Sequence, residues 1–509
     1  MKKIFVLFFL FLFSNSYSNY STPGTGVSWT MDSLVTYSNG GVTAELWGYN
    51  LMDTISVSSA DTIKVLSNCT IKMSMNIKLI VRGTLIINPP DSVLVTALDT
   101  LLAPLGFEFL NASSVSMLRK MIFEYCSSID LVNSNILIDS CVIRKNYPNN
   151  IQSSGSLDMS QSDPVISNCQ FYRNANQAIS MTDNANSSPK IINNLFYANN
   201  LYTDGPAVQI YIADPRANTS VYFTGNRVYG TYNGAAGSIN VGGVAVRSTS
   251  ITAFNVFIEN NIIKRNNYGL LLQTSWFDTL KIINNTIDSN NAFPNDSLNT
   301  GYGIRYQSGF YSACILQNNK VRGNLFGVIQ QSGFGGGINL GDLSMGDTNN
   351  TGLNKIYGNK YKGKEYAFIT YDTNKIKAEN NYWGTDNADS ILAHMYIIPG
   401  GSVDFTPYIN FVGISEPGEI VKKDFYLFYA YPNPFNPSSN IVYSLPSSKY
   451  VRVSIYNILG NRIKLLVNER QNAGNYTIKF DAQDLSSGIY FYRLEVEGFT
   501  QTKRLVHFK

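Results

Sequence analysis

Apolar residues recur in a fixed local pattern along the middle of the chain. The clearest copy is Lys281–Asn290, in which Ile282 lies three places before Asn285 and Ile287 lies two places after it. Inward side chains of a single strand recur every second residue. The three-then-two spacing therefore predicts two short strands joined by a bend. The bend is expected at Asn284, because Asn and Gly adopt positive φ at the lowest cost.

The pattern occurs nine times between about residues 136 and 385, and the residue before the central position is Asn or Gly in eight of the nine copies. The central positions are Cys141, Cys169, Asn194, Asn226, Asn261, Asn285, Asn319, Asn359 and Asn381. Successive copies lie 22 to 40 residues apart. Helical repeats keep a fixed period, whereas a solenoid of β-coils can release extra residues as loops. The sequence predicts such a solenoid, with the central Asn residues stacked as a buried amide ladder that the two cysteines begin.

A second family of strands accompanies the bends. Its members are Gln177–Met181, Ala207–Tyr211, Val244–Arg247, Gly269–Gln273, Gly303–Gln307, Gly327–Gln331 and Ala367–Tyr371. With the bends, these segments resemble the right-handed parallel β-helix of the pectate-lyase-like superfamily, over roughly residues 60 to 400. The resemblance implies an all-β solenoid fold but no particular activity, since many unrelated functions use this scaffold.

The elements around the repeat are assigned by their composition. Strands up to residue 87 are expected to form an N-terminal cap over the first open edge, and Asn380–Gly384 is expected to form the last corner. Insertions at 231–243, 291–302 and 332–352 are rich in Gly, Asn and Ser and are predicted to be loops. The cap and solenoid together are assigned to residues 19–410.

The last part of the chain has a different pattern. Residues 411–425 are expected to be a linker, and residues 426–509 to form an immunoglobulin-like β-sandwich of seven short strands. This tail resembles the type A C-terminal sorting domain of the type IX secretion system. The resemblance rests on Tyr431, Pro432, Asn433, Pro434, Phe435, Asn436 and Pro437, and on motifs that contain Gly460 and Gly488. It implies handling by the type IX machinery, export through the periplasm to the outer cell surface or the medium, and removal of the tail.

The N-terminus and the composition agree with an exported protein. Residues 1–18 have a basic start, an apolar run and small residues at 16 and 18, which is typical of a cleaved signal peptide; no later segment is expected to cross a membrane. The net charge is only +4 and no basic run is present, so no nucleic-acid partner is predicted. The five cysteines match no metal spacing and are expected to be free thiols, because stacked coils hold Cβ atoms about 4.8 Å apart, beyond the ~3.8 Å that a disulfide prefers.

Catalysis on this scaffold requires particular residues. A lyase needs clustered carboxylates for Ca²⁺ and a basic side chain, and a glycosidase needs two acids at a set separation. The seven quoted strands contain no Asp or Glu. No cofactor or metal is therefore predicted, with Ca²⁺ only in the case of a lyase. A loop-borne site that uses Asp296, Asp342 or Asp347 stays open as the alternative, which would make the protein a polysaccharide lyase or glycoside hydrolase.

The second strand family instead carries polar and aromatic side chains. They are Tyr211, Arg247, Gln273, Arg305, Gln307, Gln331 and Tyr371, with Trp276 on an adjoining loop. If these face outward, they form a groove for an extended glycan or an ordinary solvated sheet face. The leading prediction is a secreted or surface-displayed protein that is non-catalytic and binds glycans or acts in adhesion, with an extracellular polysaccharide as its partner.

Overall fold

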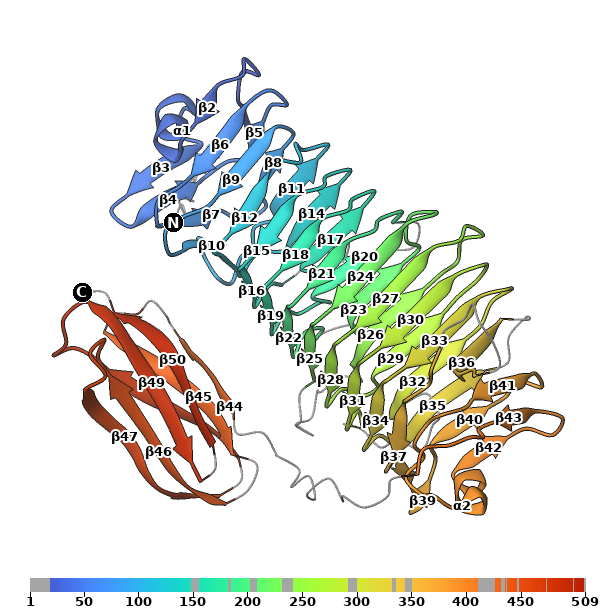
Figure 1. The fold of residues 1–509 in the computed structure, drawn as a ribbon. Coiled ribbons are helices and arrows are strands. Elements are labelled where there is room, and N and C mark those ends of the chain that lie inside the picture. Colours follow the sequence, from blue (N-terminus) through green and yellow to red (C-terminus); the bar gives the residue numbers. More distant parts are fainter. Residues whose placement is uncertain are drawn as a thin grey trace, which may run out of the picture. The chain divides into compact units, whose positions relative to one another are not determined.

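The chain is built almost wholly from β-strands, which the computed structural model arranges in two compact units, Met1–Asn410 and Phe411–Lys509 (Figure 1). The structure describes residues 19–147, 155–181, 185–201, 208–230, 241–291, 300–331, 336–343 and 350–410 of the first unit. In the second it describes residues 426–431, 435, 437–445, 448–472, 474–497 and 499–507.

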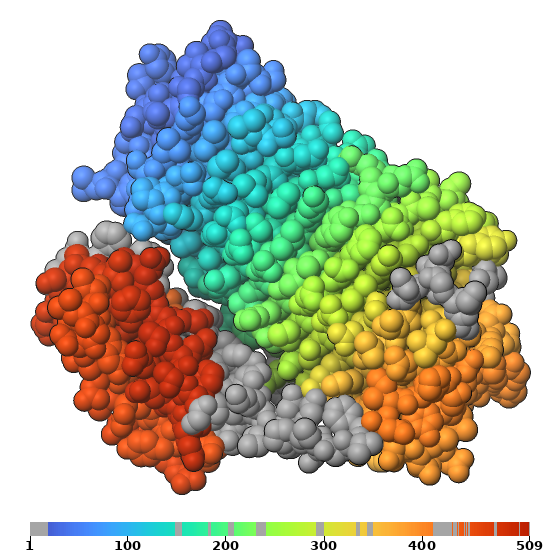
Figure 2. Space-filling model, viewed as in Figure 1, coloured from blue at the N-terminus to red at the C-terminus, as the bar shows by residue number. Residues whose placement is uncertain are grey.

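The first unit is a parallel β-helix in which each coil gives one strand to each of three long sheets, named here sheets A, B and C. Successive coils follow one another along the solenoid in sequence order (Figure 2). Sheet A contains β1 (Tyr20–Ser21), β5 (Ile55–Val57), β8 (Lys78–Val81), β11 (Gly106–Leu110), β14 (Ser128–Val132), β17 (Leu157–Ser160), β20 (Ile179–Met181), β23 (Val208–Ala213), β26 (Gly242–Arg247), β29 (Leu270–Gln273), β32 (Tyr302–Gln307), β35 (Phe326–Gln331), β40 (Phe368–Thr370) and β42 (Met395–Ile397).

Sheets B and C complete each coil. Sheet B contains β2 (Ser28–Trp29), β6 (Thr62–Val65), β9 (Thr84–Ile87), β12 (Met117–Arg119), β15 (Leu137–Asp139), β18 (Val165–Ser167), β21 (Lys190–Ile192), β24 (Ser220–Thr224), β27 (Asn255–Glu259), β30 (Thr279–Ile283), β33 (Ala313–Gln317), β36 (Gly337–Gly341), β41 (Lys375–Ala378) and β43 (Ser402–Asp404). Sheet C contains β3 (Val42–Glu45), β4 (Gly48–Leu51), β7 (Cys69–Met73), β10 (Val93–Ala97), β13 (Met121–Glu124), β16 (Val142–Arg144), β19 (Gln170–Tyr172), β22 (Leu195–Tyr197), β25 (Arg227–Tyr229), β28 (Ile262–Lys264), β31 (Thr286–Asp288), β34 (Lys320–Arg322) and β37 (Lys355–Tyr357).

The core lies inside the coils, and its residues come from the inward positions that the repeat predicts. Ile258 pairs with Ile282, which pairs with Leu316, and all three are fully buried. Aromatic rings continue the stacking where coils allow it, as in Phe171 and Phe196, whose centroids are 5.0 Å apart. No single coil could bury these side chains alone, so the core exists only because coils stack.

The predicted asparagine ladder is confirmed at the corner between sheets B and C. Asn285 Nδ2 donates to Ile258 O at 2.7 Å and to Asn319 Oδ1 at 3.0 Å, and Asn285 Oδ1 accepts from Asn261 Nδ2 at 2.9 Å. Cys141 and Cys169 begin the column, since Cys169 N donates to Asn194 Oδ1 at 2.8 Å. The residue before each member has positive φ, as predicted; it is 58° at Asn284.

One member of the predicted ladder is wrong. Asn319 N donates to Asn354 Oδ1 at 3.0 Å, and Asn354 N donates to Asn381 Oδ1 at 2.8 Å, so Asn354 and not Asn359 occupies the column. The error has a physical cause: Asn359 lies five places further on in a second ladder with the same local pattern. The corner residue before Asn354 is Leu353, with φ of 61°. Because Leu353 is neither Asn nor Gly, the sequence pattern did not identify Asn354 as the ladder residue of this copy.

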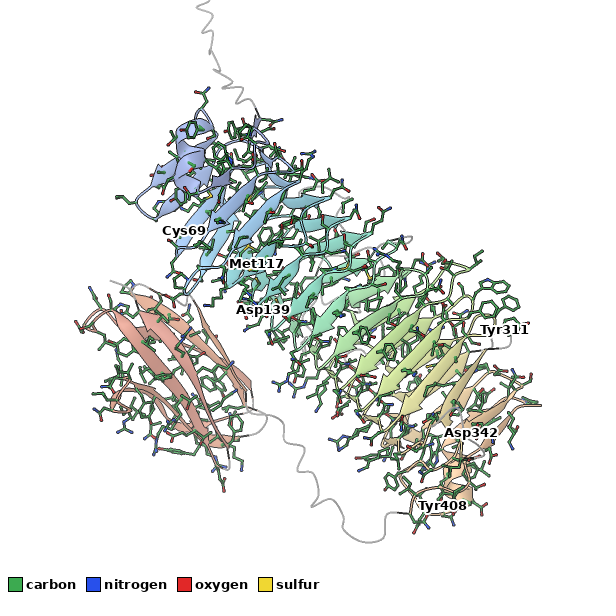
Figure 3. The ribbon with its side chains drawn as sticks, turned by 45° about the horizontal axis from the view of Figure 1, so that its top comes forward. Cys69, Met117, Asp139, Tyr311, Asp342 and Tyr408 are labelled. Carbon is green, nitrogen blue, oxygen red and sulfur yellow. The ribbon has the colours of Figure 1, made fainter. Side chains whose placement is uncertain are left out.

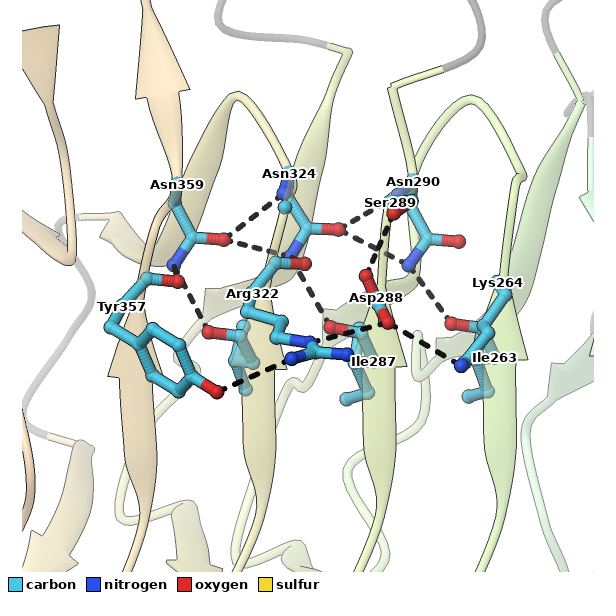
Figure 4. A network of polar contacts seen from close by, with 12 residues as sticks. Ile263, Lys264, Ile287, Asp288, Ser289, Asn290, Arg322, Asn324, Tyr357 and Asn359 are labelled. Atoms are coloured by element: carbon cyan, nitrogen blue, oxygen red, sulfur yellow. Dashed lines mark hydrogen bonds and ion pairs between the residues drawn. The ribbon is translucent and has the colours of Figure 1, made fainter. Parts of the chain in front are cut away.

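The second ladder runs along the corner between sheets C and A. Its members are Asn146, Asn174, Asn199, Gln209, Asn266, Asn290, Asn324 and Asn359 (Figure 4 shows the last three). Gln209 Oε1 accepts from Asn199 Nδ2 at 3.1 Å, and Gln209 Nε2 donates to Asn266 Oδ1 at 2.8 Å. Gln209 belongs to β23, so its longer side chain reaches into the column and keeps it continuous.

Two other expectations need correction. The strands of residues 62–87 are regular members of sheets A, B and C rather than a separate cap, and the described start of the chain holds the short helix α1 (Met31–Tyr37). The insertion at 332–352 contains strand β36, because Gly337–Ile338–Asn339 pairs with Ala313–Cys314–Ile315. At the far end lie the hairpin of β38 (Lys360–Tyr361) and β39 (Lys364–Glu365) and the helix α2 (Ala388–Ala393).

The structure also bears on the expected state of the cysteines and on membrane-spanning helices. All five cysteines are free thiols; four are buried and Cys69 is half-buried. Neither helix among the described residues has the length and apolar character needed to cross a membrane.

The second unit has its own core. Strands β44 (Tyr426–Tyr431), β45 (Ser438–Leu445) and β48 (Gly474–Asp481) form one antiparallel sheet; β46 (Lys449–Tyr456), β47 (Arg462–Gln471), β49 (Gly488–Val496) and β50 (Phe499–His507) form another. Side chains of both sheets meet in one apolar cluster that contains Ile441, Phe480, Val453 and Leu494. This is a seven-stranded β-sandwich, as the alternation predicts.

Candidate functional site

The outer face of sheet A holds most of the predicted stripe. Arg247 pairs with Gln273, Gln273 with Gln307, and Gln307 with Gln331, so these four side chains form one outward row. Tyr371 follows Thr370, which pairs with Gln330, and so lies at the end of the same row. Gln273 Nε2 donates to Gln307 Oε1 at 3.1 Å. Arg247 and Gln307 are exposed and the others are half-buried, which makes the row an accessible line of amides with a cation at one end.

The adjoining outward row is largely apolar. It contains Tyr211, Ala245, Leu271, Arg305, Ile329 and Ile369 in register. Tyr211 is 8% exposed, and Ile329 and Ile369 pack with Tyr268, Tyr302 and Phe326 in a cluster outside the solenoid core. The Arg305 guanidinium lies 5.8 Å from the Tyr302 ring centroid. Arg305 therefore lies against this cluster, which the amide row borders. Tyr211 belongs to a separate apolar cluster with Val208, Ala213 and Ala245.

Trp276 lies beside the amide row, on the corner between sheets A and B, and is not alone there. Its ring stacks on Phe310 at 4.5 Å, and Phe277 stacks on Tyr311 at 5.2 Å. Phe277, Phe310 and Tyr311 are 53%, 37% and 68% exposed (Figure 3 labels Tyr311). These four residues are called the aromatic corner. The sequence carried a signal for it, since an aromatic pair follows both Gln273 and Gln307 by three places.

The backbone of the aromatic corner is unusual. Phe277 and Tyr311 have φ of 48° and 54°, a region that bulky side chains rarely adopt. Asp278 is fully buried beside them, and its Oδ2 accepts from Ser275 N at 3.1 Å. Burial raises the pKa of Asp278 to about 6, although backbone N–H groups oppose the shift. The corner is thus a costly conformation that presents its rings to solvent.

On earlier coils of sheet A, carboxylates occupy the outward row that continues to Tyr211 rather than the amide row. Glu108 pairs with Asp130 and Asp130 with Asp158, which places three acidic side chains on consecutive strands about 4.8 Å apart. Lys78 Nζ lies 3.4 Å from Glu108 Oε2. Burial raises the pKa of Asp130; Ser128 and Lys78 oppose the shift, and the charge of Glu108 adds to it. The strand family recognised in the sequence begins at residue 177, so it does not include Glu108, Asp130 and Asp158.

The other acidic residues considered from the sequence have no such arrangement. Asp342 lies 3.6 Å from Lys377 Nζ, which also lies 3.2 Å from Glu379 and 3.8 Å from Asp404 (Figure 3 labels Asp342). This is a local ion-pair network at the end of sheet B. Asp296 and Asp347 lie outside the described residues. Across the part of the chain that the structure describes, no group of His, Cys, Asp and Glu is suited to hold a metal ion.

The described residues of the sorting motif lie in and around the sandwich core. Phe435 is buried, its N donates to Val506 O at 2.9 Å, and its ring lies 4.8 Å from His507 and 5.6 Å from Phe480. Gly460 has φ of 79° in the turn between β46 and β47. The remaining motif positions are placed as follows: Tyr431 ends β44, Pro437 O accepts from Ala482 N at 2.9 Å, Gly488 begins β49, and Pro432, Asn433, Pro434 and Asn436 lie outside the described residues.

Comparison with known families agrees with both halves of this description. Residues 106–252 match the model of the right-handed β-helix region, and residues 429–507 match the model of the secretion system C-terminal sorting domain. No curated protein matches the chain. The first unit is therefore a right-handed parallel β-helix. The second is a type IX sorting domain, which directs the protein to the cell surface or the extracellular space.

Proposed function

We propose that this exported β-helix protein binds an extracellular glycan, without cleaving it, along the amide row of sheet A and the aromatic corner. The observation that carries the proposal is that a hydrogen-bonded pair of amides, Gln273 and Gln307, lies on the outer face beside a stacked pair of aromatic rings. These rings belong to Trp276 and Phe310, which follow Gln273 and Gln307 in the sequence by three residues. Three residues of extended chain span about 10 Å, so one oligosaccharide could contact both features.

The two features suit a sugar chain chemically. A side-chain amide donates and accepts hydrogen bonds, as a sugar hydroxyl does. Exposed aromatic rings offer apolar faces for the C–H side of a sugar ring. Arg247 at the end of the row could take a carboxylate or sulfate group in a bidentate contact. The proposal needs no cofactor.

To test this proposal, the secreted protein is screened against a glycan array, and its affinity for each glycan that binds is then measured. The variants Gln273→Ala/Gln307→Ala and Phe310→Ala/Tyr311→Ala should each lower the affinity for the best glycan at least tenfold. Lys281→Ala, on the outer face of sheet B, is the matched control and should change it less than twofold. The absence of any glycan ligand, or binding that neither double variant weakens, would contradict the proposal.

A second candidate function is supported by Glu108, Asp130 and Asp158. Three carboxylates beside Lys78 on adjacent strands are the kind of group from which a glycoside hydrolase, or a polysaccharide lyase that acts without a metal ion at these carboxylates, builds its site. Incubation with pectin, alginate and glycosaminoglycans, with and without Ca²⁺, tests it. Unsaturated or newly reducing products that Asp130→Asn abolishes would establish this function and replace non-catalytic binding.

Export from the cell begins with the N-terminal segment of the chain. Residues 1–18 lie outside the described residues, and we propose that they form a signal peptide that is removed at the inner membrane. Determination of the N-terminal sequence of the secreted protein tests this. A start at Asn19 is expected, and a secreted chain that still carries Met1 would contradict it.

A further inference from the structure

Exposed apolar side chains of the sorting domain gather at one place, the turn between β46 and β47 and the first part of β47 (Figure 1). Among the described residues of this unit, six large apolar side chains are exposed: Tyr450, Ile458, Leu459, Ile463, Leu465 and Ile489. Four of the six lie between positions 458 and 465, and these four are called the apolar turn. Contiguous apolar patches on a soluble surface commonly mark sites where a partner binds.

The turn holds Ile458 and Leu459 in a fixed orientation. Asn457 Oδ1 accepts from Leu459 N at 3.0 Å and from Asn461 N at 2.9 Å, and Gly460 N donates to Asn457 O at 3.0 Å. Asn at the first position and Gly at the fourth are residues that such a turn favours. Its two central positions need no aliphatic side chain, yet Ile458 and Leu459 stand there and are 70% and 79% exposed. The turn therefore explains Asn457 and Gly460 but not the apolar pair that it presents to solvent.

Strand β47 lies at the edge of its sheet, but this edge is poorly suited to the addition of another strand. The order of the sheet is β47-β46-β49-β50, and the pairing of β47 with β46 shifts register at two places. Irregular pairing and charged side chains discourage strand addition, and the exposed Arg462 and Lys464 lie at the start of this edge. A partner that fits the surface therefore receives the apolar side chains in a pocket and does not extend the sheet.

The role of this unit identifies the partner. Residues 429–507 match the sorting domain, whose family is handled by the type IX machinery, so a protein of that machinery contacts this unit. The centre of a protein interface is more apolar than the rest of the surface, and a turn that is already fixed loses little freedom on binding. We propose that the apolar turn is the part of the sorting domain that the type IX machinery recognises, with Ile458 and Leu459 inserted in an apolar pocket of the receiving protein.

The experiment measures export of the full chain, by cell fractionation with immunoblotting, in a host that has a type IX system. Ile458→Ser/Leu459→Ser should lower the amount outside the cell at least fivefold, and Leu459→Ser alone should lower it severalfold. Tyr450→Ser is the matched control: it removes an exposed apolar side chain at the other end of β46 and should change export less than twofold. Ile458→Leu/Leu459→Ile keeps the apolar surface and should be exported as the wild type.

The melting temperatures of the purified variants should equal that of the wild type, because Ile458 and Leu459 are not part of the described sandwich core. Normal export of the double Ser variant, or an equal loss in Tyr450→Ser, would overturn the proposal. So would an export loss that accompanies a lowered melting temperature and that Leu459→Ser alone does not reproduce.

Two other occupants of the apolar turn have their own signatures. A second copy of the chain would give a wild-type dimer, measured by light scattering, that the double Ser variant converts into a monomer. A lipid surface would give binding to vesicles of phosphatidylethanolamine and phosphatidylglycerol that the same variant loses. Either result would overturn recognition by the export machinery, for which the wild type should be monomeric and should not bind these vesicles.

Discussion

Each asparagine of the two ladders uses both the donor and the acceptor of its side-chain amide. In Asn285, one amide nitrogen binds both a carbonyl of the preceding coil and the next side chain, while the oxygen accepts two N–H donors from Asn261. Asp would lack the donor, and Leu would lack both. The sequence pattern shows one ladder clearly but not the second, because Asn290 lies only five places after Asn285 and its hydrogen-bond partners lie in other coils.

Replacement of Asn285 by Leu should destabilise the β-helix strongly. The change leaves the Asn261 donors and the Ile258 carbonyl without partners, at about 1–3 kcal/mol for each buried group. Asn290→Leu should cost a similar amount, because Asn290 makes equivalent bonds to Ile263 O at 3.0 Å and Asn324 Oδ1 at 3.2 Å. Chemical denaturation measures both, with Thr286→Ala as the control. A loss confined to Asn285 would show that the second ladder does not stabilise the fold.

The buried Asp278 should make stability depend on pH. Its folded pKa of about 6 lies above the ordinary value of 3.8, so the folded state prefers the protonated form. The stabilisation is complete below about pH 4 and is lost as pH rises through 6, which amounts to roughly 3 kcal/mol. Asp278→Asn should remove this dependence. Between pH 4 and pH 8 the unfolding free energy of the wild type should therefore fall by roughly 3 kcal/mol relative to that of the variant, and parallel curves would contradict the expectation.

At the scale of elements, glycines mark where strands of sheet A meet the second ladder. A Cβ on Gly269 would lie 2.3 Å from Gly303 O and 3.3 Å from Asn290 Nδ2, and one on Gly303 would lie 2.8 Å from Gly327 O and 2.9 Å from Asn324 Nδ2. The backbone comes this close because the ladder amide fills the corner. The glycine that begins several of these strands in the sequence is thus a consequence of the ladder.

Gly303→Ala should destabilise the solenoid by about 1–3 kcal/mol, since the added methyl group forces the ladder or the next strand to move. Gly337→Ala is the matched control in sheet B, because a Cβ there meets nothing within 4 Å. Thermal unfolding of the two variants measures the difference. Equal melting temperatures would show that the corner yields without cost.

The strands could be predicted from the sequence, but the outward rows could not. Inward positions are apolar in every coil, so local spacing identifies them. Which outward residues become neighbours depends on register across loops of unequal length, as between Asp130 and Asp158 or between Tyr197 and Tyr229. The carboxylate group and the aromatic corner both arise from that register. Sequence patterns therefore showed the scaffold and named the residues of the amide row, while their separation from Tyr211 and Arg305, which lie in the adjoining row, required the register of the stacked coils.

At the scale of the whole molecule, the chain consists of two units with separate apolar cores. The sandwich buries Phe435 against Phe480 and His507, entirely within its own residues. The β-helix closes its described end with α2 and with β43, which pairs with β41. Among the described residues, each core is built from side chains of its own unit. Folding of the binding surfaces and recognition by the export machinery should therefore be separable.

Deletion of residues 426–509 tests this separation. The truncated protein should keep the unfolding transition of the β-helix and its binding properties, because the described ladders and all three long sheets end before residue 411. It should nevertheless accumulate in the periplasm of a host with a type IX system. Gly460→Val gives a finer version of the test: the turn requires φ of 79°, which Val adopts only at high cost, so the sandwich alone is perturbed. Cell fractionation with immunoblotting measures export in each case. Normal appearance of the truncated chain outside the cell would show that the signal for export lies in the β-helix.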